Sequence, residues 1–355
     1  MLLTTSIHFL VIVFLGILIL VLMLIVAVLL FSFFRYKRSL RVSEWLGMIN
    51  EKISEVIVYA DEKSVPDQNF QAFSGNLIFR NLFLHKLVDA EKKFSGTARD
   101  QIKNLFSQYD LQKEAFKKLN QKKAHLIAGG IQELTVMESE EALAKISSFL
   151  IHPSPHVYQE AQYAMVNLKG FGGLEFLDTA SGIISEWQQL RLLISIPNIP
   201  EDSGPAIAGW LSSTNDSVII FTLKLLRKFQ MLAFYPTVIR LMDHSSVAVR
   251  IQAVQTLLSL ENASTMGYLA EIYPDQPDEV QVEILRVMKI SKDQACTGLL
   301  KKELSDNIDP GIKVHAAEAL FSLGHQEYLR HLAQDESSSE ELIQIVKYAL
   351  QEKVC

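Results

Sequence analysis

The stretch that decides the fold runs from Ile312 to Gly324 and reads IKVHAAEALFSLG. Its apolar residues recur every three or four positions, and this spacing predicts one side of an α-helix. Small residues stand at Ala316 and Ala319, where they would let a neighbouring helix approach closely. A turn signal, Asp309-Pro310-Gly311, lies directly before the stretch. We therefore expect a helix that packs tightly through its alanines.

The same pattern returns along the chain at a nearly fixed interval. Val249 begins a second clear copy, with Ala253 four residues later and Leu257 eight residues later. Further copies begin at Val157, Val218 and Val280, and weaker ones at Leu126, Trp187 and Leu342. The eight starting positions are 30 to 32 residues apart, and most are followed by a second apolar segment. Helix pairs of this size cannot bury their apolar faces alone, so the pattern predicts an all-α solenoid of about eight stacked helix pairs.

The repeated motif resembles the HEAT-repeat family over about residues 126–355. The resemblance rests on Val249-Arg250…Ala253…Leu257…Leu260 and on Ile312-Lys313…Ala316…Ala319-Leu320…Leu323-Gly324. Tetratricopeptide arrays are the alternative, but their 34-residue period and Trp/Tyr/Pro signature are absent. Residues 130–134, 158–178 and 185–193 look like a bacterial group of membrane-anchored HEAT-repeat proteins. This resemblance implies an α-solenoid and no particular biochemical activity.

The first 34 residues are typical of a membrane anchor. They contain no Asp, Glu, Lys or Arg, and residues 7–34 read IHFLVIVFLGILILVLMLIVAVLLFSFF. As a helix these 28 residues would be about 42 Å long, more than the hydrocarbon core of about 30 Å. A cleaved signal peptide is disfavoured because the stretch is too long, lacks a preceding basic residue and lacks a small-residue cleavage site. A buried core helix is the other alternative.

The flanks of this segment predict its orientation. Arg35, Lys37, Arg38 and Arg41 follow it directly, whereas no basic side chain precedes it. The positive-inside rule then places the N-terminus outside and the C-terminal domain in the cytoplasm, on the inner (cytoplasmic) membrane. The only two cysteines, Cys296 and Cys355, are compatible with a reducing compartment.

Between the anchor (1–34) and the solenoid (126–355), residues 35–125 fit no repeat and form a predicted basic helical collar. The collar has 17 basic and 11 acidic residues, whereas residues 126–355 have 17 basic and 29 acidic. A positive collar beside a membrane is attracted to anionic lipid. Its densest run, either a solvated helix face or a docking surface for lipid or a partner, consists of Lys113, Lys117, Lys118, Lys122 and Lys123. The net charge of −6 argues against binding to nucleic acid.

Motifs for catalysis are missing from the sequence. It has no phosphate loop, no G-x-G-x-x-G after a strand and no H-E-x-x-H. The HEAT family includes deoxyhypusine hydroxylase, which binds two irons through His-Glu dipeptides, and this sequence has none. Bilin-lyase-like HEAT proteins are harder to exclude by motif, although they are typically soluble. Nothing places a base near Cys296. We therefore predict no catalytic residue, no metal site, no cofactor and no enzyme.

The shape of a solenoid favours a role in binding proteins. We predict a membrane-tethered cytoplasmic scaffold that holds a protein partner of unknown identity. The candidate partner-binding residues are polar or aromatic positions around the second helices, where the concave face is expected: Tyr235, Arg240, Tyr268, Tyr273, Lys301, Lys302 and Arg330. The alternatives are an accessory subunit of a membrane machine for polysaccharide synthesis or export, and an enzyme with an unrecognised site on the concave face.

Overall fold

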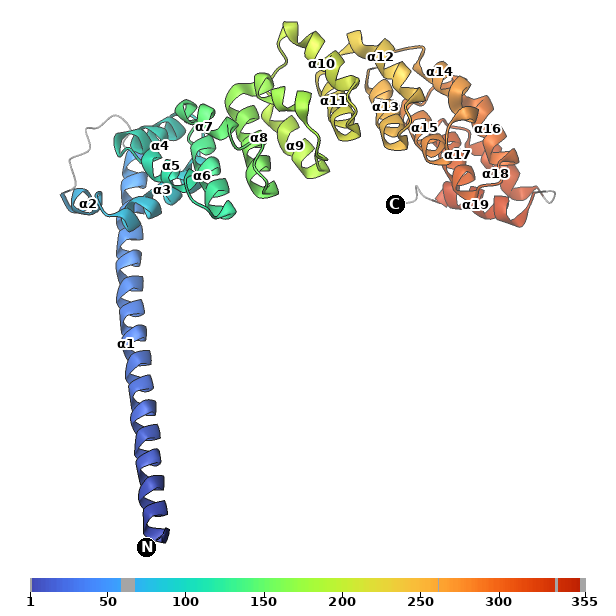
Figure 1. Ribbon diagram of the computed structural model, residues 1–355. Coiled ribbons are helices and arrows are strands. Elements are labelled where there is room, and N and C mark those ends of the chain that lie inside the picture. Colours follow the sequence, from blue (N-terminus) through green and yellow to red (C-terminus); the bar gives the residue numbers. More distant parts are fainter. Residues whose placement is uncertain (1, 59–67, 261, 336–337, 352–355) are drawn as a thin grey trace. The chain divides into compact units, whose positions relative to one another are not determined.

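The computed structural model describes residues 2–58, 68–260, 262–335 and 338–351 (Figure 1). Within these ranges the chain forms helices and turns and contains no strand, which confirms the all-α prediction. The chain divides into two compact units, Met1–Ala164 (unit 1) and Met165–Cys355 (unit 2).

Unit 1 begins with a single uninterrupted helix, α1 (Leu2–Val58), of 57 residues. The side chains of residues 11–40 are all exposed, and the helix is long and apolar enough to cross a membrane. The predicted anchor does not end in a break at residue 34. Instead, α1 continues into the unit, where Trp45, Ile49 and Ile53 are buried against α3 and α4.

The body of unit 1 is a bundle of short helices around an aromatic core. Its elements are α2 (Gln68–Phe73), α3 (Leu77–Glu91), α4 (Thr97–Gln108), α5 (Gln112–Leu119), α6 (Ala124–Val136), η1 (Glu140–Ala142) and α7 (Leu143–Ser147), and the unit ends inside α8 (Pro155–Lys169). Phe70 lies at the centre of the core, with ring centroids 5.1 Å from Phe79, 5.2 Å from Phe83 and 5.3 Å from Tyr109.

Helices α5 and α6 approach each other closely at Gly130. A Cβ atom there would lie 2.9 Å from the carbonyl oxygen of Ala115 and 2.9 Å from the Cβ of Lys118. Gly130 comes four residues after Leu126, at the place where the clear copies of the repeat have a small residue. The repeat pattern therefore identified a close helix contact in this segment.

Unit 2 is a stack of helix pairs. Its elements are η2 (Gly170–Thr179), α9 (Glu186–Ser195), η3 (Glu201–Ser203), α10 (Gly204–Leu211), α11 (Asp216–Phe229), η4 (Leu232–Phe234), α12 (Tyr235–Arg240), η5 (Leu241–Asp243), α13 (Val247–Ser259), α14 (Thr265–Ile272), η6 (Tyr273–Asp275), α15 (Asp278–Ser291), η7 (Gln294–Cys296), α16 (Thr297–Asp306), α17 (Pro310–Ser322), α18 (Gln326–Gln334) and α19 (Glu340–Gln351). The first helices α11, α13, α15, α17 and α19 pack each on the next, and the shorter second helices lie against them. These stacked helix pairs have the α-solenoid arrangement that the repeats predicted.

The helix starts follow the expected interval. Helices α11, α13, α15 and α17 begin at residues 216, 247, 278 and 310, which are 31, 31 and 32 residues apart. Ala253 and Ala316, the small positions of the two clearest copies, are completely buried. The close packing expected of these alanines is therefore confirmed.

A row of polar side chains also links successive first helices, each contact joining residues about one repeat apart. The row contains Lys224 to Gln189 (2.8 Å), Arg227 to Gln255 (3.1 Å), Gln255 to Glu283 (2.8 Å), Lys289 to Glu318 (2.9 Å) and Lys313 to Glu341 (3.6 Å). Each repeat thus contacts its neighbour through both apolar burial and polar bonds, as expected of a solenoid.

The repeat register fails at one unit. The repeat pattern predicted a copy that begins at Trp187, with this side chain in the core. Instead, Trp187 is exposed, and the buried residues of α9 are Gln188, Gln189 and Leu192. The starting position predicted for this copy of the repeat is therefore wrong. The pattern was matched on the large apolar side chain of Trp187, but in α9 this side chain lies on the face opposite the core.

Candidate functional site

Helix α9 has an apolar face that unit 2 does not cover. Trp187, Leu190 and Ile194 are 70%, 47% and 72% exposed. Their spacing of three and four residues places them on one side of the helix. We call these three residues the α9 face. Large exposed apolar groups that gather on one surface are a mark of interaction sites, whereas single ones are ordinary.

The segment before α9 extends this apolar surface. Ile183, in the turn between η2 and α9, is also exposed. Ser185 caps α9, because its hydroxyl accepts a hydrogen bond from the backbone N–H of Gln188 at 3.3 Å. The cap fixes where the helix begins and therefore which side chains point outward.

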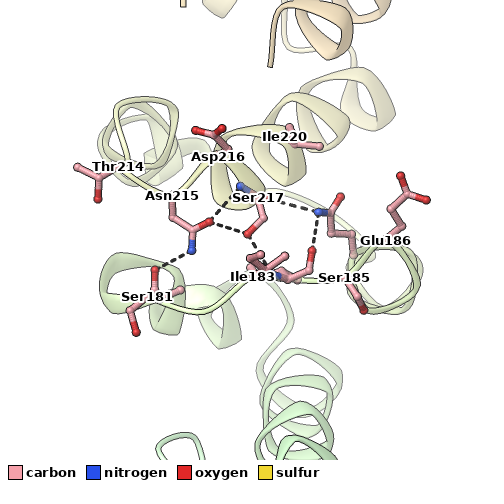
Figure 2. Close-up of a pocket in the computed structure, with 12 residues that line it drawn as sticks. Ser181, Ile183, Ser185, Glu186, Thr214, Asn215, Asp216, Ser217 and Ile220 are labelled. Carbon is pink, nitrogen blue, oxygen red and sulfur yellow. Dashed lines mark hydrogen bonds between the residues drawn. The ribbon is translucent and has the colours of Figure 1, made fainter. Parts of the chain in front are cut away.

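The turn that carries Ile183 is held by Asn215 at the start of α11 (Figure 2). The side-chain amide of Asn215 donates to the carbonyl oxygens of Ala180 and Gly182, both at 2.9 Å. Its oxygen accepts from the backbone N–H of Ser217 at 3.0 Å and from the Ser217 hydroxyl at 2.7 Å. The Ser217 hydroxyl in turn accepts from the N–H of Ile184 at 2.9 Å. These bonds tie two successive repeats together.

This arrangement explains the Asn-x-Ser spacing at both places where it occurs. Asn262 accepts from the N–H and the hydroxyl of Ser264 at 2.9 and 2.7 Å, in the same geometry as Asn215 and Ser217. In each case the spacing supports a local turn of the Asx type.

A groove of about 810 Å³ lies at the N-terminal end of α9, where Glu186 and Gln189 of that helix line it. Figure 2 shows its two walls, the turn with Ser181, Ile183 and Ser185 and the start of α11 with Asn215 and Ser217. Many of its polar atoms already bond to one another, as described above. The Asn215 amide and the Ser217 hydroxyl therefore hold the walls of the groove in place rather than pointing free into it.

Two of the residues predicted to contact a partner are buried. Tyr235 is 8% exposed and its hydroxyl lies 3.0 Å from the hydroxyl of Thr265. Tyr273 is 2% exposed and donates to a carboxylate oxygen of Glu303 at 3.2 Å. The prediction is wrong for both, because each phenol ring fills the space between successive repeats.

The remaining predicted residues are at least partly accessible. Arg240, Lys302 and Arg330 are exposed, Tyr268 and Lys301 are half-buried, and the group is divided among α12, α14, α16 and α18. Tyr268 donates to the carbonyl oxygen of Ile239 at 3.3 Å, and the Lys301 ammonium lies 4.4 Å from the centre of the Tyr328 ring. In Figure 1 the second helices of unit 2 lie on the outer side of its arc and the first helices on the inner side. The concave side that we expected on the second helices is thus formed by the first helices.

The sequence of α9 itself indicates the exposed α9 face, although the repeat pattern did not identify it. The helix EWQQLRLLIS has apolar residues on two sides, at 187, 190 and 194 and again at 192 and 193. A helix at the surface of a solenoid needs one such side for the core. The second side is the feature that points to a partner.

The four basic residues predicted to flank a membrane, Arg35, Lys37, Arg38 and Arg41, are all exposed on α1. The Lys37 ammonium lies 4.9 Å from the centre of the Phe33 ring. The lysine run of the collar is different, because three of its members have acidic partners: Lys113 with Asp110, Lys117 with Glu114 and Lys118 with Glu133. Lys122 and Lys123, the other two members of the run, are exposed.

Groups that could perform chemistry are few in the described part of the chain. No set of three His, Cys, Asp or Glu side chains is placed to hold a metal ion among these residues. Cys296 is completely buried, and burial together with the charge of Asp293 raises the pKa of its thiol to about 11. Cys355 lies outside the described residues.

Comparisons with known proteins add little to this description. No protein-family model matches the sequence, and no curated protein matches it. Solved structures with a similar arrangement include an engineered protein (TM-score 0.34, 16% identity, 85% of this chain and 87% of that chain). Human deoxyhypusine hydroxylase is similar with a TM-score of 0.29 and 14% identity, over 77% of this chain and 96% of that chain. The CpcE–CpcF complex of phycocyanin lyase from Nostoc is similar with a TM-score of 0.26 and 14% identity, over 81% of this chain and 98% of that chain. These superpositions are poor and the identities low, so nothing about the activity of this chain follows from them.

Proposed function

We propose that the chain is a membrane-anchored interaction protein of the HEAT-repeat type, and that its α9 face binds a protein partner. The HEAT assignment is supported by helices that begin at intervals of 31 to 32 residues and by the buried alanines Ala253 and Ala316. The charge-free stretch of α1 supplies the anchor. No enzymatic step is part of the proposal.

One observation carries the proposal, the exposure of Trp187, Leu190 and Ile194 together on one side of α9. Leaving such side chains in water is unfavourable by roughly 25 cal/mol per Å² of apolar area, and a partner that covers them recovers this free energy. Tryptophan is also among the residue types that dominate binding energies at interfaces.

The spacing of the α9 face defines the kind of partner. Apolar side chains separated by three and four residues on a helix fit an apolar groove or the face of another helix, as in helix-in-groove recognition. Ser181 and Ser185 line the groove at the N-terminal end of α9, and polar contacts normally occur at the rim of an interface. We therefore infer a folded protein partner with an apolar groove.

The anchor would act on this binding by restricting where the partner is met. The four basic residues after the apolar stretch support an N-terminus outside and both units in the cytoplasm, at the inner membrane. A partner that is itself held at the membrane would meet the α9 face at a high effective concentration, so modest affinity would be sufficient.

Site-specific photo-crosslinking in cells tests the proposal. A photoreactive amino acid replaces Leu190 in the full-length chain, and a second variant carries it at Ile308, which is exposed in the connection between α16 and α17. We expect a product with one particular protein from position 190 and not from position 308. Adding Trp187→Ser and Ile194→Ser should remove the product, and the purified partner should bind the wild-type chain but not this variant.

Three outcomes would contradict the proposal. Equal amounts of crosslinked product from positions 190 and 308 would mean that the partner does not bind preferentially at the α9 face. A product that persists after the two serine substitutions would mean that the face is not the determinant. A product of two copies of this chain would replace the partner protein by self-association.

A further inference from the structure

The N-terminal edge of the body of unit 1 has a second uncovered apolar surface, beside α1. Phe73, Leu77 and Ile78, in and around the turn between α2 and α3, are 36%, 55% and 44% exposed. No acidic side chain occurs from residue 68 to residue 78. We call these three residues the α2–α3 tip.

Contacts with α1 fix the position of this tip. Among residues 11–58, the part of α1 whose side chains the structure describes, Trp45 is the first that is buried. Its ring lies 5.8 Å from Phe73 and 5.8 Å from Phe79. The tip therefore sits where α1 enters the body, at the end nearest the apolar stretch, as Figure 1 shows for α2 and the start of α3.

The basic residues of α1 lie on the same side as the tip. Arg38 and Arg41 precede Trp45 by seven and four residues, which places all three on one face of the helix. Both arginines are exposed and neither has an acidic partner among the described residues. Glu44 is the one acid between residues 35 and 50. Positive charge thus stands directly before the apolar tip on one side of α1.

The length of α1 determines how far the tip lies from the apolar stretch. Trp45 comes eleven positions after Phe34, which is about 17 Å along a helix. The headgroup layer is about 5–7 Å thick on each side of the bilayer, so an upright helix would leave the tip above it. The apolar stretch, however, is about 12 Å longer than the hydrocarbon core, and a span with such an excess tilts. Tilting lowers one side of unit 1 toward the headgroups.

We propose that α1 tilts toward the α2–α3 tip, so that Phe73, Leu77 and Ile78 enter the interface of an anionic bilayer while Arg38 and Arg41 contact its lipid headgroups. Apolar side chains next to arginines form the combination that binds such an interface. Because α1 continues without a break into the core of unit 1, this second contact fixes the orientation of that unit at the membrane surface. The inference rests on the proposed membrane anchoring and is independent of the α9 face.

The test uses the full-length chain in vesicles of phosphatidylcholine alone or mixed with phosphatidylglycerol. In a Cys355→Ser background, where the remaining Cys296 is buried, Ile78→Cys carries a fluorophore that responds to polarity. Ile151→Cys is the matched control, because Ile151 is a 90% exposed isoleucine of the same unit, between α7 and α8. Quenching by lipids with a nitroxide on the headgroup reports contact with the surface.

We expect quenching at position 78 to be several-fold stronger than at position 151, with an emission shift to shorter wavelength at position 78 alone. Arg38→Gln with Arg41→Gln should reduce the quenching at position 78 in anionic vesicles toward its value in neutral ones. Equal quenching at positions 78 and 151 would overturn the inference, and so would quenching at 78 that is indifferent to lipid charge. Flotation of the same samples separates the two proposals, because a chain that fails to float with vesicles contradicts the anchoring itself.

Discussion

The indole ring of Trp45 meets the ring of Phe79 edge-on, with 5.8 Å between the two centroids. Through this contact the helix with the apolar N-terminal stretch is also a core helix of unit 1, since Trp45 is buried and Ile49 and Ile53 follow it into the interior. The apolar stretch is thereby joined to the body of unit 1 by a continuous helix whose C-terminal part packs into the core.

Trp45→Ala should destabilise unit 1 strongly. Removing a buried aromatic side chain costs about 3–5 kcal/mol, because transfer free energy is lost and a cavity remains. Trp187→Ala is the control, because Trp187 is exposed and its removal should change stability by less than about 0.5 kcal/mol. Thermal unfolding followed by circular dichroism compares the two, and equal shifts would contradict the packing of α1.

Two adjacent glycines of α6 should respond in opposite ways to alanine. Gly130→Ala places a Cβ 2.9 Å from the carbonyl oxygen of Ala115, so α5 and α6 must separate, at a cost of about 1–3 kcal/mol. Gly129→Ala meets no atom within 4 Å and should stabilise the helix by about 0.5–1 kcal/mol. Denaturant unfolding measures both, and two changes of the same sign would show that the α5–α6 contact is wrong.

Arginine at the small repeat positions should disrupt unit 2. Ala253→Arg and Ala316→Arg each force a large charged side chain into a fully buried site, and we expect a loss of about 3–5 kcal/mol. Ala295→Arg, at an exposed alanine of η7, should be nearly neutral. If both buried substitutions unfold at the wild-type temperature, the repeat register of α13 and α17 is incorrect.

The thiol of Cys296 should be unreactive while unit 2 is folded. Its pKa is raised to about 11 by burial and by Asp293, so at about pH 8 roughly one thiol in a thousand is ionised. In a Cys355→Ser variant, iodoacetamide should add no mass to the native chain and one equivalent after unfolding. Rapid alkylation of the native chain would show that the thiol is accessible.

Tyr273 should make stability depend on alkaline pH. Burial, together with the charge of Glu303 and the bond to it, raises the pKa of the Tyr273 phenol well above its usual value. The folded state therefore holds the proton more tightly, so the contribution is complete below the unfolded pKa of about 10 and decreases as the pH rises above it. Tyr273→Phe should lose about 1 kcal/mol at neutral pH and show a flatter alkaline decline. Identical pH profiles for the two proteins would contradict this assignment.

Much of the architecture was readable from the sequence because its signals are local. The apolar stretch before Arg35 needs no partner to be recognised, since a run without charge is a property of the chain itself. The repeat of small and large apolar residues around Ala253 and Ala316 is likewise a periodic pattern, and the helices begin at that period. Helix type, repeat length and the apolar N-terminal helix therefore follow from the sequence alone.

The tertiary structure decided which side chains remain at the surface. Tyrosine is a residue type common at interfaces, but Tyr235 and Tyr273 are buried between repeats. Tryptophan is a large apolar residue expected in a core, but Trp187 is exposed. Burial depends on what lies opposite a side chain, and the opposite residue here is usually about one repeat away, as Thr265 is for Tyr235. A periodic pattern specifies that a helix has an apolar side. It does not specify how many sides the neighbouring helices cover, and this number determines where a partner or a membrane surface could bind.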